Sequence, residues 1–88
     1  MSDIEDLRAE IDAVDEQLLD VLAARFELVE KIKEVKEENG MNARNDERWH
    51  NVLSNIAARA QQKSLHANGI INIYNQIHEY TLKYIYKV

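Results

Sequence analysis

Apolar residues in the first part of the chain recur at steps of three, four or seven positions. The series is Leu7, Ile11, Val14, Leu18, Leu22, Val29 and Ile32. This spacing predicts one amphipathic helix from near Asp3 to Asn39-Gly40, where the glycine supplies a left-handed stop. Ser2 and Glu5 have the spacing of a capping box at its start. Such a helix has about 35 residues and is roughly 50 Å long.

Two shorter apolar series follow and predict two further helices. Asn45 or Asp46 would cap a second helix that ends near Gln62, and a turn over 63–69 would lead to a third helix from Ile70. The apolar stripes are Trp49, Val52, Leu53, Ile56, Ala57 and Ala60 in the second helix, and Ile70, Tyr74, Ile77, Thr81, Tyr84 and Val88 in the third. We therefore expect an all-α fold of three helices, forming a single domain over residues 1–88. The second and third helices are too short to cover the first, which indicates pairing with a second copy.

Composition narrows the classes of function. The 88 residues include no Cys and no Pro, and 16 acidic against 11 basic residues give a net charge of −5. This balance argues against nucleic acid or an anionic membrane as a partner, and no apolar run is long enough for a membrane span. The acidic opening resembles neither a signal nor a transit peptide, so a cytoplasmic location is expected. Since His50, His66 and His78 are dispersed and Cys is absent, we expect no metal site.

Two cations lie on the apolar stripe of the first helix. Arg25 and Lys36 continue the rhythm of positions 22, 29 and 32. Burying an unpaired cation costs several kcal/mol, so either a neighbouring carboxylate forms a salt bridge with them or an anion binds between them. Arg8 lies about 25 Å before Arg25 on the same helix, and still farther from Lys36, so it cannot reach either cation within one chain. Antiparallel pairing of two long helices would bring the partner's Arg8 to this place and predicts an intersubunit anion site. A plain coiled coil would leave the two cations unexplained.

Several of these residues form a combined motif. It consists of an LR-x₂-ID-x₂-D-x₂-LL start at residues 7–19, Arg25 in mid-helix, Lys36 eleven positions later, and Asp46-Glu47-Arg48 after a short loop. With this motif the chain resembles the all-helical chorismate mutases. The resemblance implies an intertwined homodimer of three-helix chains, with two equivalent sites that convert chorismate, a small dicarboxylate, to prephenate without a cofactor.

The resemblance also implies a role for each cation. Arg8 would come from the partner subunit, Arg25 would clamp a carboxylate, Lys36 would lie between a carboxylate and the breaking ether oxygen, and Arg48 would form a further wall of the site. Thr81 would contact the substrate from the last helix. The Claisen rearrangement is concerted, so the protein needs only to hold a compact conformer and to stabilise charge on the ether oxygen.

The chain departs from the family pattern at three positions. Asn45 and Trp49 stand where the family usually has an acidic residue before the second-helix arginine and a Glu after it, and Ile85 stands where it has a Gln or Glu that donates to the ether oxygen. Because Ile has no donor, we expect weaker catalysis, and an Ile85→Gln variant should raise turnover. Tyr84 and Tyr86 are candidates for a substitute donor by proximity; the alternative is that both serve packing.

These departures leave other functions open. Related helical proteins rearrange 4-amino-4-deoxychorismate or eliminate pyruvate from isochorismate. A fourth interpretation is a non-catalytic, mutase-like binding or regulatory subunit. Chorismate rearrangement, in aromatic amino-acid or related biosynthesis, ranks first because Arg8, Arg25, Lys36 and Arg48 are all present.

Overall fold

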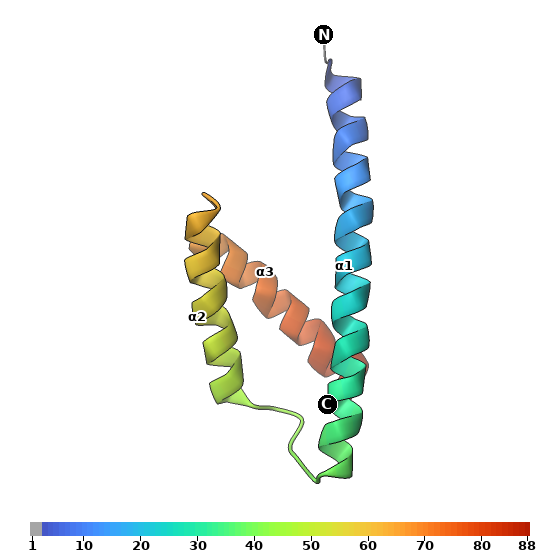
Figure 1. The fold of residues 1–88 in the computed structure, drawn as a ribbon, viewed down its shortest axis with the longest axis vertical. Helices are drawn as coiled ribbons and strands as arrows, with labels where there is room; N and C mark the ends of the chain where they lie inside the picture. Colours follow the sequence, from blue (N-terminus) through green and yellow to red (C-terminus); the bar gives the residue numbers. More distant parts are fainter. Residues whose placement is uncertain (1–2) are drawn as a thin grey trace.

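The computed structural model describes residues 3–88, which form three α-helices and one π-helical turn. Helix α1 spans Ile4–Glu38, α2 spans Asp46–Gln62 and α3 spans Ala67–Tyr80. The π-helical segment η1 (Thr81–Tyr86) continues α3 directly. The described residues contain no strand (Figure 1), so the predicted all-α class and the three helices are confirmed.

Helix α1 has a defined cap at each end. The Asp3 carboxylate accepts from the Asp6 backbone N–H at 3.0 Å, and the Asp6 carboxylate accepts in return from the Asp3 N–H at 3.4 Å. This capping box differs from the predicted one, whose Ser2 lies outside the described residues. At the other end Gly40 is left-handed, with φ of 64°, and the Met41 N–H donates to the Lys36 carbonyl at 2.8 Å. This Schellman arrangement explains the predicted stop after 35 residues.

Helix α2 also begins and ends where the sequence predicted. The Asn45 side chain caps its start by accepting from the Arg48 N–H at 3.0 Å. Beyond its end Ser64 takes the left-handed conformation, with φ of 61°, and the Leu65 N–H donates to the Ala60 carbonyl at 2.9 Å. The same Schellman geometry therefore closes α2, although here the left-handed residue is a serine.

Helix α3 begins three residues earlier than predicted. The expected turn through Gly69 and start at Ile70 are wrong, because the His66 imidazole caps the helix at Ala67. Its Nδ1 accepts from the Gly69 N–H at 3.1 Å. An imidazole can serve as an acceptor in this way, but histidine is not among the favoured N-cap residues, so the sequence pattern did not signal this start.

The end of the third helix also differs from the prediction. In η1 the Lys87 N–H donates to the Leu82 carbonyl, five residues back, and Lys87 itself is left-handed. This wider turn changes the register of the last residues. As a result Tyr84 is 56% exposed and Val88 lies beyond the helix, so neither continues the predicted apolar stripe.

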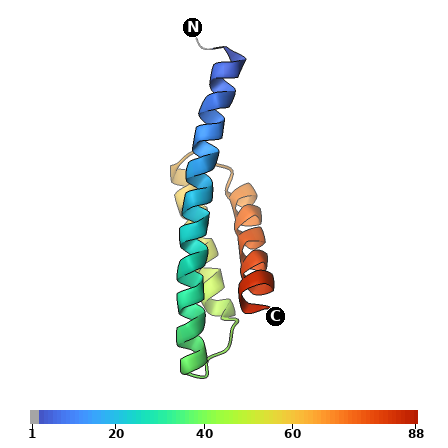
Figure 2. The ribbon, with the colours of Figure 1, turned by 90° about the vertical axis from the view of Figure 1, so that its right-hand side faces the viewer.

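The helices form an open arrangement. Helices α2 and α3 make an antiparallel pair, and α3 crosses toward the carboxyl-terminal half of α1, while the amino-terminal half of α1 extends beyond both (Figures 1 and 2). Stacked rings of Phe26 and Tyr80, 4.2 Å apart at their centroids, join α1 to α3. The shape is elongated, with a radius of gyration of 16.4 Å, whereas a compact chain of this length has about 12 Å.

Few side chains are shielded from solvent within one chain. Among residues 3–88 only Ala60, Thr81 and Ile85 are buried. The four residues of the predicted stripe in the amino-terminal half of α1 are all more than half exposed: Leu7, Ile11, Val14 and Leu18. The predicted stripe therefore exists, but no other part of residues 3–88 covers this half of it. No described helix is long and apolar enough to cross a membrane.

Candidate functional site

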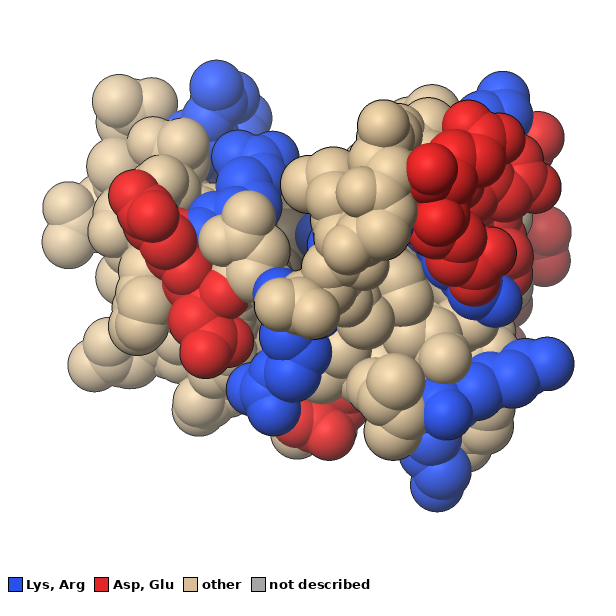
Figure 3. Space-filling view, turned by 90° about the horizontal axis from the view of Figure 1, so that it is seen from below, with Lys and Arg blue, Asp and Glu red and all other residues tan. Residues whose placement is uncertain are grey.

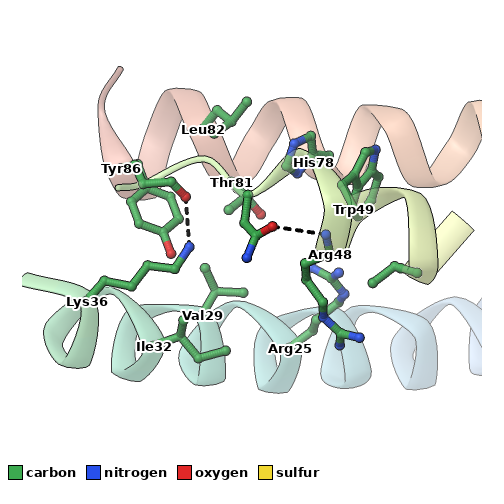
Figure 4. A pocket seen from close by; sticks show the side chains of 13 residues that line it. Arg25, Val29, Ile32, Lys36, Arg48, Trp49, His78, Thr81, Leu82 and Tyr86 are labelled. Carbon is green, nitrogen blue, oxygen red and sulfur yellow. Dashed lines mark hydrogen bonds between the residues drawn. The ribbon is translucent and has the colours of Figure 1, made fainter. Parts of the chain in front are cut away.

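A cavity of about 220 Å³ lies between the carboxyl-terminal half of α1, the start of α2 and the junction of α3 with η1 (Figure 4). Six of the residues that the sequence singled out line it: Arg25, Lys36, Asn45, Arg48, Trp49 and Thr81. They come from three helices and the connector before α2, so the fold joins residues up to 56 positions apart in the sequence. The volume suits a small, compact ligand, since pockets for drug-sized ligands are usually about 300–1,000 Å³.

Three cationic side chains meet at this cavity. Arg25 and Lys36 lie on one face of α1 with Val29 and Ile32 between them, and Arg48 approaches from the first turn of α2 (Figure 4). Basic side chains also line the central hollow when the molecule is seen from below, while acidic side chains form one group at the right-hand edge and another to the left of the hollow (Figure 3). The helical spacing predicted from the sequence therefore places Arg25 and Lys36 in one site.

No carboxylate balances these cations within residues 3–88. Asp and Glu are absent from the cavity lining, and the ion pairs of the described residues are Arg8–Glu5, Lys33–Glu37 and Arg44–Asp46. The salt-bridge interpretation of Arg25 and Lys36 therefore has no acidic partner among residues 3–88. Unpaired cations around a partly enclosed cavity favour an anionic ligand.

Lys36 is held at the connector end of the cavity. Its Nζ donates to the Ala43 carbonyl at 2.8 Å and lies 5.1 Å from the centroid of the Tyr86 ring. The hydrogen bond and the cation–π contact restrict the side chain without neutralising it. Because an ammonium group has three donors, two remain for a ligand.

The family model of chorismate mutase type II matches residues 7–86. The chain belongs to this family. The matched range includes the whole cavity and also Arg8. Searches of curated proteins and of solved structures found no match.

Arg8, which the sequence motif predicted to serve a site across a dimer interface, does not line the cavity of its own chain. Arg8 is on the extended amino-terminal part of α1 (Figure 2), where its side chain is 63% exposed and pairs with Glu5 at 2.9 Å. Arg8 and Arg25 lie on the same unbroken helix, and a rise of about 1.5 Å per residue separates them by roughly 25 Å along its axis. Arg8 is therefore available at the surface for another molecule.

Two of the departures from the chorismate mutase pattern have structural roles. Asn45 caps α2 through its side-chain oxygen, as an Asp at this position could. The Trp49 indole N–H donates to the Asn75 side chain at 3.2 Å, and its ring stacks on His78 with centroids 4.1 Å apart. Trp49 therefore presents an aromatic surface to the cavity, where the chorismate mutase pattern usually has a carboxylate.

His78 lines the cavity and was missed as a site residue in the sequence. Burial lowers its pKa below the ordinary value of 6.5, and the positive charges of Arg44 and Arg25 act in the same direction, partly opposed by Glu79 and Asp46. The imidazole is therefore neutral at pH 7. The available signal was its position three residues before Thr81, which places both side chains on one helix face.

Thr81 and Ile85, the last two predicted site residues, both lie in η1, but only Thr81 lines the cavity. The Thr81 hydroxyl is buried and donates to the Ile77 carbonyl at 3.2 Å, and Thr81 lines the cavity. Ile85 is only 5% exposed but does not line the cavity, whereas Tyr86 does. The register of the π-helical turn explains this outcome. An Ile85→Gln substitution would place its amide away from the site, which removes the reason to expect a gain in turnover.

Proposed function

We propose that the protein is a chorismate mutase that converts chorismate to prephenate in aromatic amino-acid or related biosynthesis. One observation carries this proposal: Arg25, Lys36 and Arg48 line a single cavity that has no acidic side chain. Chorismate carries two carboxylates, so its charge complements this set of cations. Membership of the chorismate mutase type II family supports the same reaction.

The proposed reaction suits a site of fixed positive charges. In a Claisen rearrangement the ether C–O bond breaks while a new C–C bond forms, and no proton or electron is exchanged with the protein. The protein accelerates such a step by selecting a compact conformer and by stabilising negative charge on the ether oxygen. Arg25 and Arg48 would bind carboxylates through paired N–H donors, and Lys36 would direct a compact charge at the ether oxygen.

We further propose that the active form is an interlocked homodimer. The chain has an accessible surface of 7228 Å², compared with about 5,400 Å² for a compact monomer of 10.3 kDa. The excess of roughly 1,800 Å² per chain corresponds to the large interfaces of obligate dimers. Antiparallel pairing of two α1 helices would cover the exposed stripe from Leu7 to Leu18 and would bring Arg8 of one copy toward the cavity of the other.

The assembly can be tested by sedimentation of the purified protein. We expect one species of twice the chain mass, and a melting temperature that rises with protein concentration because the folded state requires association. A folded monomer at micromolar concentration would contradict the dimer.

The reaction can be tested with chorismate itself. Loss of the diene absorbance with formation of prephenate is the expected result. Parallel assays should follow 4-amino-4-deoxychorismate consumption and pyruvate release from isochorismate. Activity on either of these substrates without activity on chorismate would assign the same cavity to a different reaction.

A binding protein without turnover is the second candidate. Two residues favour it: Trp49, whose indole N–H already donates to Asn75, and Ile85, which lies outside the cavity lining. In that case the protein would bind a bicyclic dicarboxylate mimic of the transition state but would leave all three substrates unchanged. Binding of the mimic without turnover of any substrate would distinguish this candidate from the three enzymes.

A further inference from the structure

Tyr86 occupies the part of the cavity where the pattern of the sequence placed Ile85. It is half-buried, it lines the cavity, and its ring lies 5.1 Å from the Lys36 Nζ. Ile85 points elsewhere because η1 has i→i+5 hydrogen bonds, which place more residues in each turn than an α-helix has. Because of the π-helical turn, the phenol of Tyr86 lies at this end of the cavity in place of the apolar side chain of Ile85.

The Tyr86 hydroxyl is available to a ligand. It makes no side-chain hydrogen bond within the described residues. Figure 4 shows the hydroxyl end of the ring directed toward Lys36, beside the Nζ that the Ala43 carbonyl holds in place. Two donors of different character, a phenol O–H and an ammonium N–H, thus converge on one region.

The adjacent tyrosine does not share this position. Tyr84 is 56% exposed, and its ring contacts Tyr80, at a centroid distance of 4.9 Å, and Lys83. It lies outside the cavity lining. The geometry thus distinguishes two residues that the sequence left equivalent.

We propose that Tyr86 is a catalytic residue whose hydroxyl donates, together with Lys36, to the oxygen that gains negative charge as the ether bond breaks; this rests on the mutase function proposed above. The phenol keeps its proton throughout, because the rearrangement transfers none to or from the protein. A donor fixed before the reaction stabilises developing charge more than it stabilises the neutral ether of the substrate. Its loss should therefore lower kcat more than it raises KM.

Tyr86→Phe tests this role, since it retains the ring over Lys36 and removes only the hydroxyl. With chorismate as substrate we expect kcat to fall by about 10- to 100-fold, while KM stays within about twofold. The melting temperature should be unchanged, because the hydroxyl has no hydrogen-bond partner among residues 3–88 to lose. Tyr84→Phe is the matched control: it makes the same chemical change two residues away, outside the cavity, and should leave kcat at the wild-type value.

A third variant tests whether residue 85, and not residue 86, reaches the ether oxygen. Ile85→Gln should give no gain in kcat and should lower stability, because it puts an amide where Ile85 is buried. Wild-type turnover in Tyr86→Phe, or a change confined to KM, would overturn the role of the hydroxyl while leaving the mutase function intact. A gain of activity in Ile85→Gln would also overturn it, since residue 85 would then reach the ether oxygen. A wild-type protein inert toward chorismate would instead reject the proposed function itself, and this role with it.

Discussion

Removal of the Arg25 side chain should affect ligand binding, whereas removal of a surface cation with an ion-pair partner should affect that ion pair. Arg8 and Arg44 have carboxylate partners, whereas Arg25 lies near Arg48 and Lys36 around a cavity without acids. Because Arg25 has no ion pair among residues 3–88, we expect its charge to serve ligand binding. A preorganised cluster of like charges is a common compromise between stability and binding at functional sites.

We predict that Arg25→Ala lowers affinity for a bicyclic dicarboxylate mimic by roughly 10- to 150-fold, the equivalent of about 1.5–3 kcal/mol for hydrogen bonds to a charged group. The free energy of unfolding should change by less than about 0.5 kcal/mol, because repulsion from the other cations is also removed. Calorimetric titration and urea unfolding measure the two quantities. Arg59→Ala, at an exposed position on α2 outside the cavity, is the control. Reduced stability with unchanged affinity would indicate a salt bridge after all.

His78 should make the free energy of unfolding depend on pH. Its pKa in the folded chain is below 6.5, mainly because of burial, so the unfolded chain binds a proton first as the pH falls. This histidine therefore costs no stability above about pH 6.5 and destabilises the fold progressively below it. We predict that the free energy of unfolding depends less steeply on pH between 5 and 7 in a His78→Gln variant than in the wild type. Equal slopes in urea unfolding series would show that the imidazole titrates as it does in the unfolded chain.

The sequence identified the cations of the cavity but not the residues that complete it. Arg25 and Lys36 could be found because a helix with 3.6 residues per turn puts them on one face regardless of tertiary contacts. Tyr86 could not be preferred to Tyr84, because that choice depends on a π-helical turn with no sequence signature. The hydrogen bond that holds Trp49 could not be predicted either, because its partner Asn75 is 26 positions away and becomes its neighbour only in the folded chain.

Helix ends were predictable where a residue with special backbone freedom marked them. Asn39-Gly40 ends α1 as expected, since glycine takes the left-handed conformation without strain. The early start of α3 was not predictable, because His66 caps it with an imidazole. Local sequence therefore determined the long helix almost completely, while the carboxyl-terminal third depended on specific side-chain contacts.

The end of α2 offers a way to stabilise the protein. Ser64 is left-handed in the same Schellman arrangement that Gly40 provides for α1, and a side chain with a Cβ is strained in this conformation. We predict that Ser64→Gly raises the free energy of unfolding by about 0.5–1 kcal/mol. Gly40→Ala should lower it by a similar amount, since nothing lies within 4 Å of the added Cβ and only the backbone is strained. Thermal or urea unfolding measures both effects, and a destabilised Ser64→Gly would show that the serine hydroxyl matters more than the strain.

At the scale of the whole molecule, the separation of Arg8 from the cavity gives a test of the shared site. In the proposed dimer each site combines Arg25 of one chain with Arg8 of the other. Arg8→Ala and Arg25→Ala dimers should each have little activity. When the two variants are unfolded together and refolded, half of the dimers are mixed, and each mixed dimer contains one intact site. We predict recovery of roughly a quarter of the wild-type turnover per chain, as measured with chorismate.

The controls for this experiment are the two variants refolded separately. They should stay at their low activities, so recovery must come from mixed dimers. Absence of recovery would show that Arg8 and Arg25 do not act across an interface. Full activity of the Arg8→Ala variant alone would show that the site does not use Arg8.

In the proposed dimer, the small number of side chains that one chain buries would also determine how long two partners stay together. A separated chain has only Ala60, Thr81 and Ile85 shielded among its residues 3–88, too few to keep it folded by hydrophobic burial. For the proposed dimer, dissociation and unfolding would then be a single event. Subunits would exchange between dimers no faster than the dimer unfolds, and two preformed populations mixed without denaturant would keep their original partners. Hybrid dimers would arise only where both chains are synthesised, or refolded, in the same place at the same time.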